Sequence, residues 1–183
     1  MKKRKIIIAT SSSRGISCIN YMKNKSKIMA IITNKNFYEK NLTYIDKNIF
    51  IIGSINNKRI INKIKLLKPE FLILCGYNEI LEKDFFKQKN IIILNLHAGD
   101  INKYRGSSPL NWALINNEKE IILNILKLDK KIDNGPIIAN KTFKIKDNLN
   151  IEDLHKIADK QFPILLDKAI KNYNKLNNNN NSL

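Results

Sequence analysis

Cysteine, arginine and long apolar runs are all scarce in this chain of 183 residues. The two cysteines, Cys18 and Cys75, lie in apolar stretches, which excludes a disulfide framework and predicts reduced thiols in the core. No apolar run approaches the roughly 18 residues that a transmembrane helix needs. The apolar run at 6–9 is too short for a secretory signal. We therefore expect a cytoplasmic protein that has no contact with a membrane.

The net charge is +17, although only four of the 33 basic residues are arginine. Two interpretations stay open. The abundance of lysine together with asparagine and isoleucine fits a compositional bias, and the lysines are scattered along the chain. A functional positive field would instead attract polyanions or phosphorylated substrates. Because most of the lysines are scattered outside the short basic stretch at 2–5, we favour the first interpretation and do not expect a nucleic acid as partner.

The apolar segments alternate between short runs and helical spacing, which is typical of an α/β domain. We expect strands at 5–10, 28–33, 49–52, 71–75, 91–97, 121–128 and 137–145. Helices should follow Ser11–Gly15, Ser54, Ser108 and Asn150, with a short helix at Phe85 and Phe86, and 34–48 should be loop. This order predicts a mostly parallel, mixed and twisted sheet with helices on both faces, a Rossmann-like fold. The domain should span 1–175, followed by a disordered, asparagine-rich tail at 176–183.

The stretch 90–112 is the most informative. An apolar run at 91–94 suits a strand buried on both faces, and it ends in Asn95-Leu96-His97. Alternation along the strand places the Asn95 and His97 side chains on one face. Polar side chains at the end of a buried strand cost desolvation energy, and α/β sheets bind ligands at the carboxyl ends of their strands. Ser108 and Pro109 then predict the start of a helix in which Trp112 is a core residue.

These residues resemble the folate-dependent formyltransferases, over about 5–173. The resemblance rests on four motifs: Asn95-Leu96-His97, Lys103-Tyr104-Arg105-Gly106, Pro109 to Ile115, and Asp133-Asn134-Gly135-Pro136-Ile137. It implies that Asn95 and His97 stabilise the oxyanion formed when an amine attacks a formyl group, and that Asp133 holds His97 in one tautomer. The implied donor is 10-formyltetrahydrofolate, and no metal is required.

The resemblance also implies which residues contact the two substrates. The donor would be bound by Tyr77, Asn78, Glu79, Ile80 and Leu81 and by Asp129 and Ile132. The acceptor would meet the hydroxyls, amides and guanidinium groups of Ser12, Ser13, Arg14, Arg105 and Gly106. Two segments depart from the family pattern. Ile101-Asn102 stands where the family loop often has Leu-Pro, and Ile122, Asn124 and Leu126 stand where many members have Gly, Thr and His. These departures leave the acceptor geometry open.

Three family branches differ in their acceptor. The sugar N-formyltransferase branch is most similar, through His97-Ala98-Gly99, the 108–112 motif and Asp153 to Pro163, so we expect an amino-sugar nucleotide. Glycinamide ribonucleotide and methionyl-tRNA are the alternatives. A protein of another class, a basic binding protein without activity on the same fold, also stays open because a fold does not imply a function. A homodimer is one option for its assembly.

Overall fold

The computed structural model describes residues 3–87, 90–129, 135–146 and 148–180. Its strands are β1 (Lys5–Thr10), β2 (Lys27–Thr33), β3 (Phe50–Ile52), β4 (Phe71–Cys75), β5 (Ile92–Ala98), β6 (Glu120–Lys127) and β7 (Ile137–Lys144). They form one sheet in the order β3-β2-β1-β4-β5-β6-β7. Strand β1 is parallel to β2 and β4, β2 is parallel to β3, and β6 is antiparallel to β7. The predicted α/β fold with a mixed, mostly parallel sheet is confirmed.

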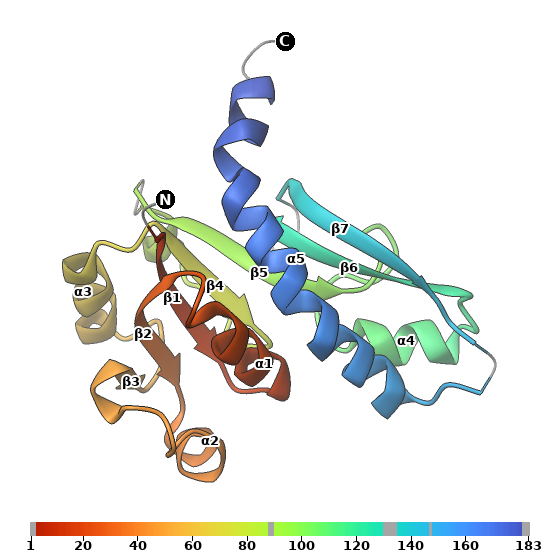
Figure 1. The fold of residues 1–183 in the computed structure, drawn as a ribbon, viewed down its shortest axis with the longest axis horizontal. Coiled ribbons are helices and arrows are strands. Elements are labelled where there is room, and N and C mark those ends of the chain that lie inside the picture. Colours follow the sequence, from red (N-terminus) through yellow and green to blue (C-terminus); the bar gives the residue numbers. More distant parts are fainter. Residues whose placement is uncertain (1–2, 88–89, 130–134, 147, 181–183) are drawn as a thin grey trace. The chain divides into compact units, whose positions relative to one another are not determined.

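The chain divides into two compact units, residues 1–94 and 95–183. The first contains β1 to β4 with α1 (Ser13–Met22), α2 (Lys35–Asn41), α3 (Lys58–Leu67) and the 3-10 helices η1 (Lys47–Ile49) and η2 (Lys83–Lys87). Helix α1 packs against β1 and β4 (Figure 1). Strand β4 is buried along its whole length, as expected for an inner strand of a parallel sheet. Both cysteines are buried and reduced, as predicted.

Two predictions for the first unit are wrong. The stretch 34–48 is not all loop, because α2 begins after Asn34, whose side chain accepts a hydrogen bond from the Phe37 backbone. This helix buries none of its residues, so it has no apolar periodicity that a sequence pattern could show. Helix α3 is capped by Asn57 and not by Ser54, whose hydroxyl accepts a hydrogen bond from the Asn56 backbone in the preceding turn.

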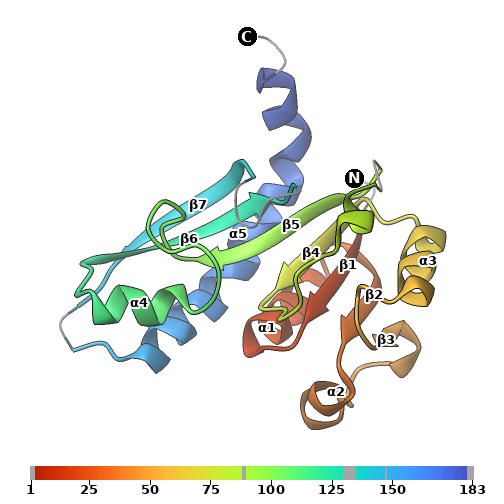
Figure 2. The ribbon, with the colours of Figure 1, turned by 180° about the vertical axis from the view of Figure 1, so that it is seen from behind.

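The second unit contains α4 (Pro109–Ile115) and α5 (Ile151–Asn180) beside β6 and β7. Helix α5 covers one face of β6 and β7, which Figure 2 shows from behind. Its start is capped as predicted: the Asn150 side chain accepts from the Asp153 backbone, and the Asp153 carboxylate accepts from the Asn150 backbone. The helix continues to Asn180, into the stretch 176–183 that the sequence predicts to be a tail. The extent of the catalytic domain, residues 1–175, stays a prediction.

Helix α4 differs from expectation in one respect. Trp112 is 51% exposed, so its predicted place in the core is wrong. The helix is short and buries only Leu110 and Ala113, which leaves Trp112 outside the buried stripe. Ser108 precedes the helix as predicted, but its backbone is left-handed and its hydroxyl makes no capping hydrogen bond. No helix in the described part of the chain is long and apolar enough to cross a membrane.

Candidate active site

His97 is held at the end of β5 by a backbone carbonyl. Its side chain is 4% exposed, and its Nε2 lies 2.6 Å from the carbonyl oxygen of Tyr104. A carbonyl can only accept a hydrogen bond, so Nε2 carries the proton. The family resemblance implies that Asp133 controls the tautomer, and Asp133 lies outside the described residues. The Tyr104 carbonyl is a partner that the sequence could not reveal, because a backbone oxygen has no residue signature.

Tyr104 is fixed from the far end of α4. Its hydroxyl donates to Glu118 at 2.8 Å and accepts from the Asn116 amide at 2.9 Å. The Lys103 ammonium binds the same Glu118 oxygen at 2.9 Å. The hydrogen bond from Lys103, followed by that from Tyr104, lowers the pKa of the Glu118 carboxyl below its usual value. This network of exposed and half-buried groups sets the position of the carbonyl that binds His97.

Gly99 permits a close approach between the loop and α4. A Cβ at this position would lie 2.4 Å from the Pro109 Cβ and 3.5 Å from the His97 Nε2. The first distance is too short for two carbons, so only a bare backbone fits. The glycine of the loop is therefore required by packing beside the histidine ring.

Asn124 on β6 holds this loop through a hydrogen bond to its backbone. Its side-chain amide donates to the Gly99 carbonyl at 2.8 Å, and the residue is 1% exposed. Its Oδ1 is buried and has no partner among the described residues. Sequence analysis treated Asn124 only as a departure from the family pattern. The sequence does contain an indication of this role, because an asparagine in the middle of an apolar strand is expected to be buried and then needs a hydrogen-bond partner.

Arg105 and Gly106 shape the same loop. The Arg105 Nε donates to the Ile101 carbonyl at 2.9 Å, and the residue is exposed. Gly106 has a positive φ of 86°, which favours glycine, although a Cβ there would meet nothing within 4 Å. Both residues thus have a role in the loop's conformation, and contact of either with an acceptor stays a prediction.

The motif around Asp133 is partly described. Gly135 is buried against β6, because a Cβ there would meet the Lys127 carbonyl oxygen at 1.6 Å. The Lys127 backbone also donates to the Pro136 carbonyl at 3.0 Å, which brings the two ends of the β6–β7 connection together. The glycine of the Asp-Asn-Gly motif is therefore sterically required. Asp129 is exposed, whereas Ile132 and Asp133 lie outside the described residues.

In the first unit, the turn after β1 is tied to the end of β4. The Ser12 hydroxyl donates to the Cys75 carbonyl at 3.1 Å, and Thr10 donates to the same oxygen at 2.8 Å. The Ser12 hydroxyl is therefore used by the fold, which weakens its predicted role toward a phosphate. Ser13 is exposed and Arg14 is half-buried, and their contact with an acceptor stays a prediction.

The predicted donor loop after β4 is stabilised by its own polar side chains. The Tyr77 hydroxyl donates to Glu79 at 2.9 Å and accepts from the Ile55 backbone at 3.1 Å. Burial, together with Glu79, raises the pKa of the Tyr77 phenol well above its usual value, although the Ile55 bond opposes this. Ser54 donates to the other Glu79 oxygen. Tyr77 and Glu79 therefore support the loop's shape.

Asn56 completes this support and was missed by sequence analysis. Its amide donates to the Ile80 carbonyl at 2.9 Å, and its oxygen accepts from the Glu82 backbone at 3.0 Å. Of the predicted donor-binding side chains, Leu81 is buried, Asn78 is exposed and Ile80 is 69% exposed. Contact of these side chains with a donor stays a prediction. Within the described residues, no group of His, Cys, Asp and Glu could hold a metal.

Residues 4–170 match a protein-family model described as formyl transferase. The bifunctional polymyxin resistance protein ArnA of Wigglesworthia glossinidia brevipalpis is 30% identical over 174 residues, covering 85% of this chain and 26% of that protein. A methionyl-tRNA formyltransferase of Finegoldia magna is 32% identical over 125 residues, covering 67% and 39%. The chain thus spans well under half the length of these curated relatives.

Solved structures share the fold. The phosphoribosylglycinamide formyltransferase of Bacillus halodurans matches with a TM-score of 0.74 and 19% identity, over 90% of this chain and 94% of that one. A formyltetrahydrofolate deformylase of Pseudomonas syringae matches with a TM-score of 0.76 and 16% identity, over 94% and 61%. At these identities the likeness concerns the fold alone.

Proposed function

Because the chain belongs to the formyl transferase family, we propose that it transfers a formyl group from 10-formyltetrahydrofolate to an amine. The observation that carries this proposal is His97, buried at the end of β5 with its Nε2 proton bound to a carbonyl. Asn95 lies two residues before His97 on β5, so the two side chains lie on the same face of the sheet. An amide and an oriented imidazole suit acyl transfer, in which negative charge develops on one oxygen.

In this reaction the amine nitrogen attacks the formyl carbon and the carbonyl π electrons move onto oxygen. Asn95 donates a hydrogen bond to that oxyanion, an interaction that contributes about 10²–10³ in rate in comparable sites. The intermediate then collapses, the bond to the folate nitrogen breaks, and the amine's proton ends on the departing nitrogen. The products are a formamide and tetrahydrofolate, and no bond to the protein forms.

The geometry of His97 refines its role. A neutral imidazole has one N–H, and that one is bound to Tyr104. His97 can therefore donate to the oxyanion only when it is charged, through Nδ1. In the family pattern Asp133 favours this charged form and helps a water take the amine's proton. Asn95, His97 and Asp133 are thus the proposed catalytic residues.

For the acceptor we propose an amino-sugar nucleotide. The support is the resemblance of 97–99, 108–112 and 153–163 to that branch, together with the exposed guanidinium-bearing Arg105, which suits a diphosphate. Methionyl-tRNA is the second candidate, because relatives of that name are 32% to 42% identical over parts of this chain. A cytoplasmic location and a homodimer are further parts of the proposal.

The test is an acceptor screen with purified protein and 10-formyltetrahydrofolate, following the release of tetrahydrofolate. The acceptors are amino-sugar nucleotides, glycinamide ribonucleotide and charged initiator tRNA, and a reaction without acceptor measures hydrolysis. We expect formamide formation with an amino-sugar nucleotide. A higher kcat/KM with charged tRNA or glycinamide ribonucleotide would replace the amino-sugar nucleotide as acceptor. Release of tetrahydrofolate at the same rate with and without every amine, with no formamide formed, would contradict formyl transfer.

A further inference from the structure

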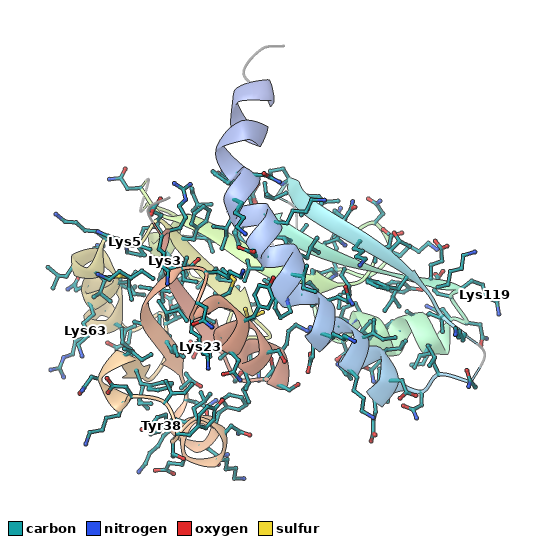
Figure 3. The ribbon with its side chains drawn as sticks, in the orientation of Figure 1. Lys3, Lys5, Lys23, Tyr38, Lys63 and Lys119 are labelled. Atoms are coloured by element: carbon teal, nitrogen blue, oxygen red, sulfur yellow. The ribbon has the colours of Figure 1, made fainter. Side chains whose placement is uncertain are left out.

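The first unit has a cavity of about 740 Å³ at the amino ends of its strands. Its wall includes Lys3 before β1, Lys5 at the start of β1, Lys23 after α1, and Lys27 at the start of β2. Lys3, Lys5 and Lys23 are labelled in Figure 3. The candidate donor loop and the Ser11–Gly15 turn follow the carboxyl ends of β4 and β1. The cavity is therefore at the opposite end of β1 from both.

The four lysines concentrate positive charge at the cavity. Among the residues that the structure describes, no acidic side chain lines the cavity, and the ion pairs found involve none of the four ammonium groups. The nearby carboxylate of Glu70 accepts from the Lys5 backbone and pairs with Arg4 at 2.7 Å. Lys5 and Lys27 are register partners on adjacent strands, so like charges stand side by side. An anionic ligand would remove this repulsion.

The floor of the cavity is apolar. Ile19 is 2% exposed, and Ile28, Ile45 and Ile49 line the cavity as half-buried residues. Tyr44 stands at the rim with 64% of its surface exposed. A flat apolar body could thus lie on aliphatic and aromatic side chains while its charged end meets the lysines. A volume near 740 Å³ falls within the range of roughly 300–1,000 Å³ found for small-molecule sites.

We propose that this cavity binds a nucleoside polyphosphate. Lysine ammonium groups act as point charges that suit phosphate oxygens, and four of them match the charge of a triphosphate. The base would contact the isoleucine floor and Tyr44, because aromatic rings stack on any base. The cavity is lined by none of the residues proposed for formyl transfer, so its test does not depend on that reaction.

The test measures ATP binding to the full chain by calorimetry, with inorganic tripolyphosphate as a second probe. Lys23→Gln with Lys27→Gln removes two charges from the cavity. Lys63→Gln with Lys65→Gln removes two charges from exposed positions of α3 and is the matched control. We expect one ATP per chain, about 10- to 100-fold weaker binding in the cavity pair, and less than about twofold change in the control pair.

A third variant tests the nucleoside. Tyr44→Ser should weaken ATP binding several-fold and leave tripolyphosphate binding unchanged, because only the base meets the ring. Equal loss in both lysine pairs would show attraction by net charge alone and overturn the site, as would the absence of ATP binding. Tripolyphosphate binding as tightly as ATP, with no effect of Tyr44→Ser, would overturn the nucleoside assignment. Unfolding temperatures of the variants verify that each remains folded.

Discussion

Asn124→Leu is expected to separate activity from stability. In the folded protein the Asn124 amide holds the buried Gly99 carbonyl at 2.8 Å, while its Oδ1 is buried without a described partner. Leucine has a similar shape, so it removes one hydrogen bond and one unsatisfied acceptor together. Leaving the Gly99 carbonyl unpaired costs about 1–3 kcal/mol, and removing the orphaned oxygen recovers a similar amount. The free energy of unfolding should therefore change by less than about 1 kcal/mol.

The loop, however, loses its anchor beside His97. If the displaced loop raises the activation free energy by about 1.5–2 kcal/mol, kcat falls by about 10- to 30-fold, since 1.36 kcal/mol is a factor of ten. Urea unfolding and steady-state kinetics measure the two quantities. The control is Asn140→Leu, at the exposed register partner of Asn124 on β7. An unchanged kcat in Asn124→Leu, or a loss of stability above about 3 kcal/mol, would refute the reasoning.

Three further expectations follow from the same loop. Gly99→Ala places a Cβ 2.4 Å from that of Pro109 and should destabilise the fold by roughly 1–3 kcal/mol, seen as a lower Tm; an unaltered Tm would mean that the contact is relieved without cost. The pKa of Glu118 is lowered from 4.5, so its contribution to stability is present above that pH and is lost as the pH falls through the lowered pKa. Glu118→Gln should therefore be more destabilising at pH 7 than at pH 3 in denaturant titrations, and equal effects would contradict the network. Arg105→Gln should raise the KM for the acceptor more than that for the folate, and unchanged values for both would remove Arg105 from the acceptor site.

Patterned apolar burial could be predicted from the sequence. Strands such as β1 and β4 are short runs of buried aliphatic residues, and Asn150 and Asp153 form a cap that is visible in the chain itself. Where burial is absent, the prediction failed: α2 buries nothing, and a helix of that kind depends on local capping that many loop sequences also contain. Trp112 was misassigned because apolar character does not determine which side of a seven-residue helix is buried.

The sequence predicts which residues form the candidate site, but it does not predict which groups hold those residues in place. Asn95 and His97 are recognisable because polar side chains end a buried strand. The groups that hold the site are less visible, since the Tyr104 carbonyl and the Gly99 carbonyl are backbone atoms that any residue would supply. Asn56 braces the donor loop across 24 residues of sequence, a separation over which no local pattern extends.

The most direct measurement of the central claim compares two histidine variants in formyl transfer. His97→Gln retains an amide that can donate to the Tyr104 carbonyl, so the loop should stay in place while the imidazole is lost. His155→Gln, at the other histidine and on the exposed side of α5, is the matched control. With 10-formyltetrahydrofolate and a saturating amine, the account predicts a kcat at least about 100-fold lower for His97→Gln and an unchanged kcat for His155→Gln. A kcat for His97→Gln within a few-fold of the unsubstituted protein would contradict it.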